Sequence, residues 1–378
     1  MAKKIKNLIN FRPKKIQDKH MPKNFDISLK SYGGGGSATN LNPNPNKLKP
    51  QNMEGFESKY ANIIDYIVKI TFTIWEKKNI GYIYDTYSHD CIVWDEIGLQ
   101  HGSEKIVSDT VHTNNAFPDI RLFAEEVIWA GDHKVGYHTS HRTIITGTNT
   151  GYSKFSSPTG NKVRLFCIAN CVAKNNEIFY ENVVYDTAGL IKQLGLNIDD
   201  IAKQVSKEIK DGDFTAITDK KKFNRNIKKI KDYKIPDLSQ NLNVRNFVHS
   251  SFDQIWNRRN FSLIQEIYST NVDFEGSTMR KFKGAHKLKD FIISLIACFP
   301  DLALNIEDLY WMGNQKDGYL ISIRWAAIGT HKGNGMYGQP TNKKCQLWGI
   351  TQWEVKNNQI IKEWTGFNEF AIHVQLAR

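Results

Sequence analysis

The residues best suited to acid/base chemistry lie at the end of a strand-like segment near the middle of the chain. Tyr180, Asn182, Val184 and Asp186 alternate there, so their side chains share one face of a predicted strand. If that face lines an apolar pocket, burial would raise the pKa of the Asp186 carboxyl into a range that suits proton transfer. Asp186 would serve equally well as the N-cap of the helical segment 187–194.

An arginine recurs in two other strand-like segments, as Arg142 and Arg324. Each shares its face with small or apolar residues, which predicts that the guanidinium points inward. An inward arginine must pair with an acid or bind an anionic or carbonyl oxygen. Both a structural ion pair and a ligand contact therefore remain open, with Arg142 the candidate that stabilises an enolate-like oxygen.

The remaining polar candidates predict neither a metal site nor a cofactor site. His138 and His141 are three residues apart in a strand, so their side chains point to opposite faces and cannot chelate one ion. His331 lies in a glycine-flanked turn, either at the mouth of a pocket or on the surface. The sequence has neither a glycine-rich phosphate loop after a strand nor a serine nucleophile elbow.

The chain repeats itself at a spacing of 182 residues. Between residues 117–194 and 299–376, 27 of 78 positions are identical without a gap, among them Trp129 and Trp311. Upstream the spacing becomes 181, and Tyr87 matches Tyr268. Two copies of this size indicate a duplicated domain rather than a solenoid.

Each copy begins with helical patterns and continues with strands. Apolar residues recur at helical spacing in 56–77 and 243–258, and a later helix ends at a Phe-Pro-Asp turn in each copy. Long strands follow, separated by glycine-rich turns. This order predicts an α+β fold, with helices on one face of a curled antiparallel sheet.

Charge and composition divide the chain into four parts. The net charge is +12, yet residues 1–50 alone carry eleven Lys or Arg and two Asp. We expect a basic flexible arm (1–54), a first domain (55–196), a basic connector (197–240) and a second domain (241–378). The domains themselves are close to neutral, which disfavours a specific nucleic-acid partner. With no long apolar run and five scattered cysteines, the sequence favours a cytoplasmic protein without a membrane span.

Several turns resemble those of the SnoaL-like polyketide cyclases of the nuclear transport factor 2-like superfamily. The second copy has Gly329-Thr330-His331-Lys332-Gly333. The first has Pro158-Thr159-Gly160 and a closing Asp186-x-x-Gly189-Leu190-x-x-Gln193-Leu194-Gly195. The resemblance implies two tandem cone-shaped domains, each with an apolar pocket. It also implies an aldol-type ring closure that uses an Asp on the last strand and needs no metal or cofactor.

The two copies depart from the family pattern in different places. The first has Asn149 where the turn histidine would be, and the second has Trp364 and Asn368 at the positions of Asn182 and Asp186. An asparagine cannot exchange a proton near neutral pH, so the first copy is the better candidate for turnover. The ligand contacts that we expect are Tyr180, Asn182, Arg324, His331, Trp364 and Asn368.

Three functions remain open at this stage. The first is a cofactor-independent cyclase or isomerase that acts on a small apolar carbonyl compound, with Asp186 and Arg142 as catalytic residues. The second is a non-catalytic ligand-binding or scaffolding protein, and the third an epoxide-type hydrolase, which would need a second inward carboxylate. Fold alone does not decide among them. A homo-oligomer and an internal pairing of the two domains are both compatible with the sequence.

Overall fold

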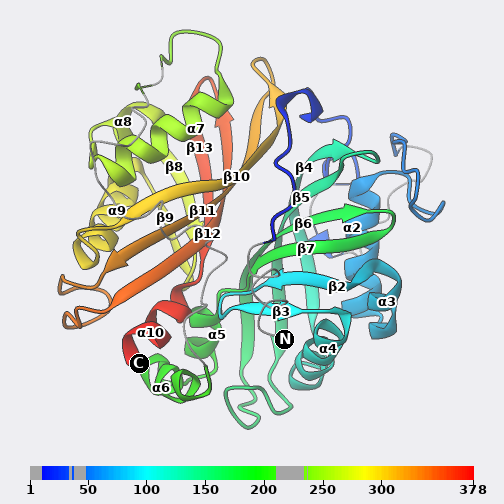
Figure 1. The fold of residues 1–378 in the computed structure, drawn as a ribbon, viewed down its shortest axis with the longest axis horizontal. Coiled ribbons are helices and arrows are strands. Elements are labelled where there is room, and N and C mark those ends of the chain that lie inside the picture. The colour runs from blue at the N-terminus through cyan, green and yellow to red at the C-terminus, as the bar shows by residue number, and fades with distance from the viewer. Residues whose placement is uncertain (1–10, 34–35, 38–47, 210–233, 236) are drawn as a thin grey trace.

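The fold was analysed in a computed structural model of the chain. It describes residues 11–33, 36–37, 48–209, 234–235 and 237–378. Two α+β domains stand side by side, with their sheets towards the centre and most of their helices outside (Figure 1).

The first domain is built on one curled sheet. Its strand order is β1-β4-β5-β6-β7-β2-β3. The strands are β1 (Gly36–Ser37), β2 (Tyr87–Trp94), β3 (Leu99–His101), β4 (Arg121–Asp132), β5 (Gly136–Thr148), β6 (Lys162–Lys174) and β7 (Glu177–Val184). The helices are α2 (Ile63–Thr71), α3 (Ile83–Thr86), α4 (Ser103–Ala116) and α5 (Thr187–Gln193), with a π-helical turn, η3 (Phe72–Glu76), continuing α2.

The second domain repeats this arrangement in the order β10-β11-β12-β13-β8-β9. Its strands are β8 (Tyr268–Gly276), β9 (Arg280–Lys283), β10 (Ala303–Asn314), β11 (Gly318–Thr330), β12 (Lys344–Lys356) and β13 (Gln359–Phe367). Its helices are α7 (Val244–Phe252), α8 (Leu263–Ile267), α9 (Ala285–Cys298) and α10 (Glu369–Ala377), with η7 (Asp253–Asn257) after α7. The matching strand orders confirm the predicted tandem α+β fold.

The sheets are mixed rather than wholly antiparallel as expected. The last long strand of each domain pairs in parallel with its first, β7 with β2 and β13 with β8. The chain reaches that first strand directly after its opening helices, so the closing pair runs in the same direction. This closure curls each sheet and leaves a concave face that the domain's own helices cover.

The opposite, outer faces of the two sheets pack against each other (Figure 1). A mixed cluster of buried apolar side chains joins them, with Ile144, Phe166 and Val184 from the first domain and Ala326 and Trp348 from the second. Both faces of each sheet are therefore buried in much of their length. The pairing of the two domains, which the sequence left open, occurs within one chain.

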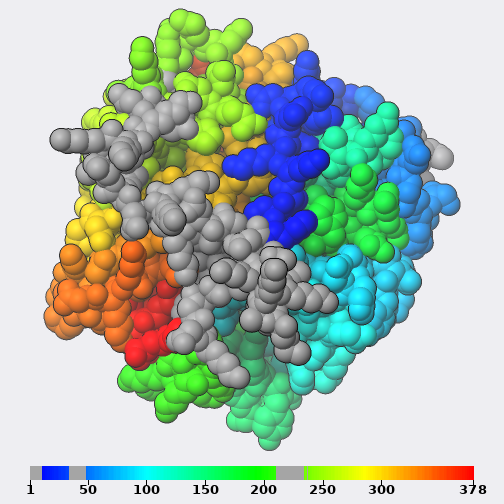
Figure 2. All heavy atoms as spheres, in the orientation of Figure 1, coloured from blue at the N-terminus to red at the C-terminus, as the bar shows by residue number. Residues whose placement is uncertain are grey.

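The described part of the N-terminal arm is ordered against both domains. Ile16, Met21, Leu29 and Tyr32 are buried with the core of the first domain. On the other side, Gly313 N of the second domain donates to Pro22 O at 2.9 Å. Residues 11–33 lie along the junction of the domains (dark blue in Figure 2). This stretch packs against the domains, because four of its apolar side chains are buried there.

The connector begins with helix α6 (Ile198–Glu208), which packs against α10. Residues 1–10, 34–35, 38–47, 210–233 and 236 of the expected arm and connector lie outside the described residues. Within the described residues, no helix combines the length and apolarity needed to cross a membrane.

Candidate functional site

The concave face of the first domain carries a cluster of polar side chains. Side chains along β5, β6 and β7 point alternately to the two faces of the sheet. Those of His141, Cys171 and Glu181 point to the concave face, where Tyr87 of β2 joins them. Tyr87, His141 and Tyr185 lie deep in the domain yet remain partly exposed. Side chains that are deep but accessible are typical of a face open to a small molecule.

Glu181 is the acidic member of this cluster. Its side chain is 7% exposed, and Tyr87 Oη donates to Glu181 Oε2 at 3.0 Å. The pairing is built into the sheet, because Tyr87 lies on the strand that runs parallel to β7. Burial raises the pKa of Glu181 to about 7, although the Tyr87 hydroxyl opposes the shift. Glu181 can therefore gain or lose a proton near neutral pH.

His141 is the basic member. Burial lowers its pKa to about 4, so the ring is neutral at pH 7. Its Nε2 has no hydrogen-bond partner among the described residues. In the tautomer that carries its hydrogen on Nε2, a neutral imidazole can donate a hydrogen bond to a carbonyl oxygen without carrying charge.

The corresponding carboxyl in the second domain, Glu363, is buried and hydrogen-bonded. It accepts hydrogen bonds from Tyr268 Oη at 2.6 Å, Trp353 Nε1 at 2.8 Å and Thr365 Oγ1 at 2.8 Å. Burial raises its pKa. The cavity beside it measures about 20 Å³, enough for roughly one water molecule.

Large side chains explain why this second concave face is closed. At the positions of His141, Thr143 and Cys171 in the first domain, the second domain has Ile323, Trp325 and Trp353, respectively. These three replacements are 4% exposed or less. The two concave faces therefore differ, because the first carries partly exposed polar side chains whereas the second is packed with large apolar ones.

Asp186 lies at the junction of the two domains and lines neither the cavity beside Glu363 nor a larger cavity between the domains. Its side chain caps α5 by accepting from Gly189 N at 3.2 Å, and it also accepts from the backbone N–H groups of Thr278 and Met279 in the second domain. Burial raises its pKa to about 6, while these backbone donors oppose the shift. Asp186 is thus the N-cap of α5, one of the two roles that the sequence suggested for it.

The other predicted residues of β7 and β5 point away from the concave face. Tyr180 and Asn182 do share one face as expected, but it is the outer face, towards the second domain. Arg142 also lies on the outer face of its strand. It donates to Glu125 Oε2 at 3.1 Å and, across the domain junction, to Gln352 Oε1 at 2.8 Å, and it stacks on the ring of Trp364.

The two predicted residues in loops of the second domain have local partners. His331 is buried in its turn, with Nδ1 3.3 Å from Thr341 Oγ1. Asn368 is also buried, and its Oδ1 accepts from Trp348 N at 2.9 Å. Both hold loops together, and neither lines a described cavity.

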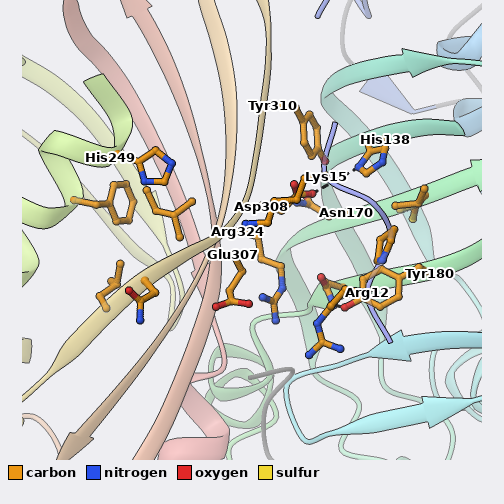
Figure 3. Close-up of a pocket in the computed structure, with 18 of the residues that line it drawn as sticks. Arg12, Lys15, His138, Asn170, Tyr180, His249, Glu307, Asp308, Tyr310 and Arg324 are labelled. Carbon is orange, nitrogen blue, oxygen red and sulfur yellow. Dashed lines mark hydrogen bonds and ion pairs between the residues drawn. The ribbon is translucent and has the colours of Figure 1, made fainter. Parts of the chain in front are cut away.

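A larger cavity of about 320 Å³ lies between the two domains (Figure 3). Arg324 points into it from β11, and the described N-terminal segment supplies Arg12 and Lys15. The first domain contributes His138, Asn170, Tyr180 and Asn182, and the second contributes Glu307, Asp308 and Tyr310. The structure thus brings Tyr180, Asn182 and Arg324 together, but separates them from Asp186, Trp364 and Arg142.

The sequence analysis did not select Glu181, Tyr87 or His141 as site residues. A usable signal existed for two of them, because Glu181 and Glu363 are identical in the repeat, as are Tyr87 and Tyr268. A glutamate kept in both copies on a strand of buried residues needs a partner, and the tyrosine is that partner in each domain.

A comparison with known protein families finds a match within the second domain. Residues 247–376 match the family model of the SnoaL-like polyketide cyclases. The chain thus resembles this family, and its two domains share one α+β fold. A search of curated proteins found no match.

Solved structures similar to the chain each cover about a third of it. A candidate SnoaL-like polyketide cyclase from Jannaschia sp. CCS1 is 14% identical, over 34% of this chain and 88% of that one, with a TM-score of 0.31. IdmH from Streptomyces antibioticus, described as a candidate polyketide cyclase, is 16% identical over 34% and 96%, with a TM-score of 0.30. TsrD from Streptomyces laurentii is 13% identical over 34% and 91%, also with a TM-score of 0.30.

Proposed function

We propose that the protein is a cofactor-independent enzyme of the cyclase or isomerase type, whose reaction site is the concave face of the first domain. The observation that carries this proposal is Glu181, a buried carboxyl with a pKa of about 7 on a face that remains partly accessible. Acid/base catalysis is most effective when the pKa of the catalytic group lies near the working pH. The match of the second domain to the SnoaL-like cyclases supports the same class of reaction.

In the proposed reaction, the Glu181 carboxylate removes a proton from the carbon next to a carbonyl group of the substrate. The electron pair of that C–H bond forms an enolate, whose oxygen accepts a hydrogen bond from neutral His141. In a ring closure, the enolate carbon then attacks a second carbonyl of the same molecule, and the new alkoxide takes the proton back from Glu181. In an isomerisation, the proton returns to a different carbon. Both routes balance without an oxidant, a metal or a cofactor.

The substrate class follows from the surroundings of Glu181. The walls of the concave face are apolar and aromatic, including Trp75, Ile106 and Tyr185. Such a face suits a small or medium-sized apolar carbonyl compound, with the carbonyl oxygen directed to the polar cluster. We place the protein in the cytoplasm, as its sequence suggests.

Glu181 takes the role that the sequence favoured for Asp186. Asp186 is held by three backbone N–H groups at a domain junction, whereas Glu181 lies on the accessible concave face. An epoxide-type hydrolase would need an arginine beside the carboxylate, and both Arg142 and Arg324 lie on the opposite face of their sheets. A ligand-binding protein remains the second candidate, favoured by the cavity between the domains.

The proposal can be tested without the natural substrate. The α-protons of 2-tetralone are acidic, and their exchange for deuterium in buffered D₂O can be followed by proton NMR. We expect the full chain to accelerate exchange and Glu181→Gln to lower the accelerated rate by about 10²- to 10⁴-fold. Glu363→Gln, the matched change in the second domain, should leave the rate unchanged.

Asp186→Asn decides between the two assignments. If it abolishes exchange while Glu181→Gln does not, the sequence-based choice of Asp186 is right and the proposed site is wrong. If neither variant changes the rate, or the full chain gives no acceleration, the enzyme proposal is contradicted. Circular dichroism and thermal unfolding of each variant establish that a lost rate does not reflect a lost fold.

A further inference from the structure

The two buried arginines of the repeat have different surroundings, although they occupy equivalent positions. Arg142 has hydrogen-bond partners on two of its guanidinium nitrogens. Its Nε donates to Glu125 at a bulge in β4, its Nη1 donates to Gln352 across the junction, and the Trp364 ring lies 3.5 Å from its Cζ. Carboxylate, amide and aromatic ring together satisfy both the charge and the flat face of the guanidinium.

Two side chains at the equivalent positions around Arg324 are smaller than those around Arg142. The positions of Gln352 and Trp364 are taken in the first domain by Asn170 and Asn182. Glu307, at the matching bulge in β10, forms no ion pair with Arg324. Arg324 is 3% exposed, and none of its three guanidinium nitrogens has a hydrogen-bond partner among the described residues. The guanidinium carbon Cζ of Arg324 lies 5.4 Å from the centre of the Trp348 ring.

Because Asn170 and Asn182 are smaller than Gln352 and Trp364, a cavity remains beside Arg324. The cavity of about 320 Å³ occupies this place, and Asn170, which lines it, has no hydrogen-bond partner for its Oδ1 among the described residues. In Figure 3, Arg324 and Tyr180 point into the same space from opposite domains. A buried cation without a partner is costly, so its retention beside a cavity indicates a ligand.

Arg324, rather than the net charge of the cavity wall, favours an anionic ligand. Arg12, Lys15 and Arg324 bring three positive charges to its wall, against Glu307, Asp308 and Asp253. Asp253 is already bonded to Arg258, with Oδ2 accepting from Nε at 2.7 Å, and Asp308 lies 3.6 Å from His138 Nδ1. None of these three carboxylates forms a hydrogen bond with Arg324.

We propose that the cavity between the domains binds a planar aromatic carboxylate, with the carboxylate on Arg324 and the ring in the place that Trp364 takes on Arg142. The ligand supplies what Glu125 and Trp364 supply in the equivalent half. This site lies on the opposite face of the sheet from Glu181, so it is separate from the proposed reaction site and does not depend on it. The cavity volume falls at the lower end of small-molecule pockets.

Isothermal titration of the full chain with 2-naphthoate, at pH 7.5 and up to 1 mM, tests this site. The uncharged analogue 2-naphthamide and the smaller benzoate complete the set of probes. We expect 2-naphthoate to bind more tightly than 2-naphthamide. Arg324→Gln should weaken 2-naphthoate on the order of 10- to 100-fold and remove most of its advantage over the amide, since a charged hydrogen-bonding pair is lost.

Two further variants keep the test decisive. Asn182→Trp should fill the cavity as Trp364 fills the other half, and should abolish binding of both naphthalene probes while the protein stays folded. Arg142→Gln is the matched control and should leave the 2-naphthoate affinity within about twofold. The proposal is overturned if none of the carboxylates binds the full chain, or if either Arg324→Gln or Asn182→Trp binds 2-naphthoate as the unchanged protein does. Binding that Arg142→Gln removes as completely as Arg324→Gln would also overturn it.

Discussion

Arg142 Nη1 of the first domain donates a hydrogen bond of 2.8 Å to Gln352 Oε1 of the second, and this bond lies buried between the two sheets. Gln352 also donates from Nε2 to Ser140 Oγ at 2.9 Å, so one amide satisfies two groups of the opposite domain. The equivalent amide, Asn170, reaches Ser322 Oγ at 3.3 Å but leaves its Oδ1 unpaired. The junction is therefore well bonded on one side and open on the other.

Removal of the two amides should have unequal effects. Gln352→Ala leaves Arg142 and Ser140 without their partner in a buried place, which we expect to lower the free energy of unfolding by about 2–3 kcal/mol. Asn170→Ala removes one long hydrogen bond and should cost about 1 kcal/mol or less. Urea denaturation measures both, and equal losses would contradict the asymmetry of the junction.

The two arginines should likewise respond differently to replacement by methionine, which keeps much of their volume. Arg142→Met removes a buried guanidinium that is bonded to the partly exposed Glu125 and to buried Gln352, so we expect a loss of about 2–3 kcal/mol. Arg324→Met removes a cation that has no partner among the described residues and should be neutral or stabilising. Thermal unfolding of the two variants side by side provides the comparison. A larger loss for Arg324→Met would show that Arg324 is bonded in solution.

The stability of the protein should depend on pH through Glu181. Burial raises its folded pKa from the ordinary 4.5 to about 7. The folded state then binds the proton more tightly than the unfolded state, so this contribution is complete below pH 4.5 and is lost as the pH rises through about 7. Glu181→Gln keeps an uncharged side chain at every pH, and its stability should fall less than that of the unchanged protein between pH 5 and 8, by up to about 3 kcal/mol. Parallel pH curves for the two proteins would contradict the shift.

Replacement of a large core side chain in the second domain should lower the free energy of unfolding strongly. Trp325→Thr installs the residue that the first domain has at Thr143, and it removes a large side chain that is only 4% exposed. It also removes a hydrogen bond of 3.1 Å to Thr351 Oγ1. We expect a loss of about 3–5 kcal/mol. The matched Thr143→Ala in the first domain should cost less than about 1 kcal/mol, because solvent already reaches that position. Similar losses at the two positions would mean that both concave faces are packed.

The sequence predicted the duplicated fold well because the repeat is a global signal. The gapless spacing of 182 residues aligns the long strands and the Phe-Pro-Asp turns, and the strand order is the same in both domains. The parallel closing pair was not predicted, since pairing between β7 and β2 depends on residues about 90 positions apart and leaves no local pattern.

The orientation of the strands could not be read from the same pattern. An alternation of apolar and polar side chains along a strand reveals its two faces only when one face is exposed to solvent. Here the outer faces are buried against the other domain, and positions Leu165 to Ala173 of β6 are buried without interruption. Tyr180 and Asn182 therefore looked as suitable for a pocket as Glu181, although they line the junction. Pairing of the domains was the missing fact, and it decides which residues each face presents.

The most direct test of the central claim is a titration of the Glu181 carboxyl by carbon-13 NMR in the full chain labelled at glutamate. The signal is assigned by its absence in Glu181→Gln. A midpoint near pH 7 is the predicted result, because burial raises the pKa of Glu181 to about 7 and an acid/base group must change charge near the working pH. A midpoint near 4.5, the value of an ordinary exposed glutamate, would contradict the claim that this carboxyl is the acid/base group of the protein.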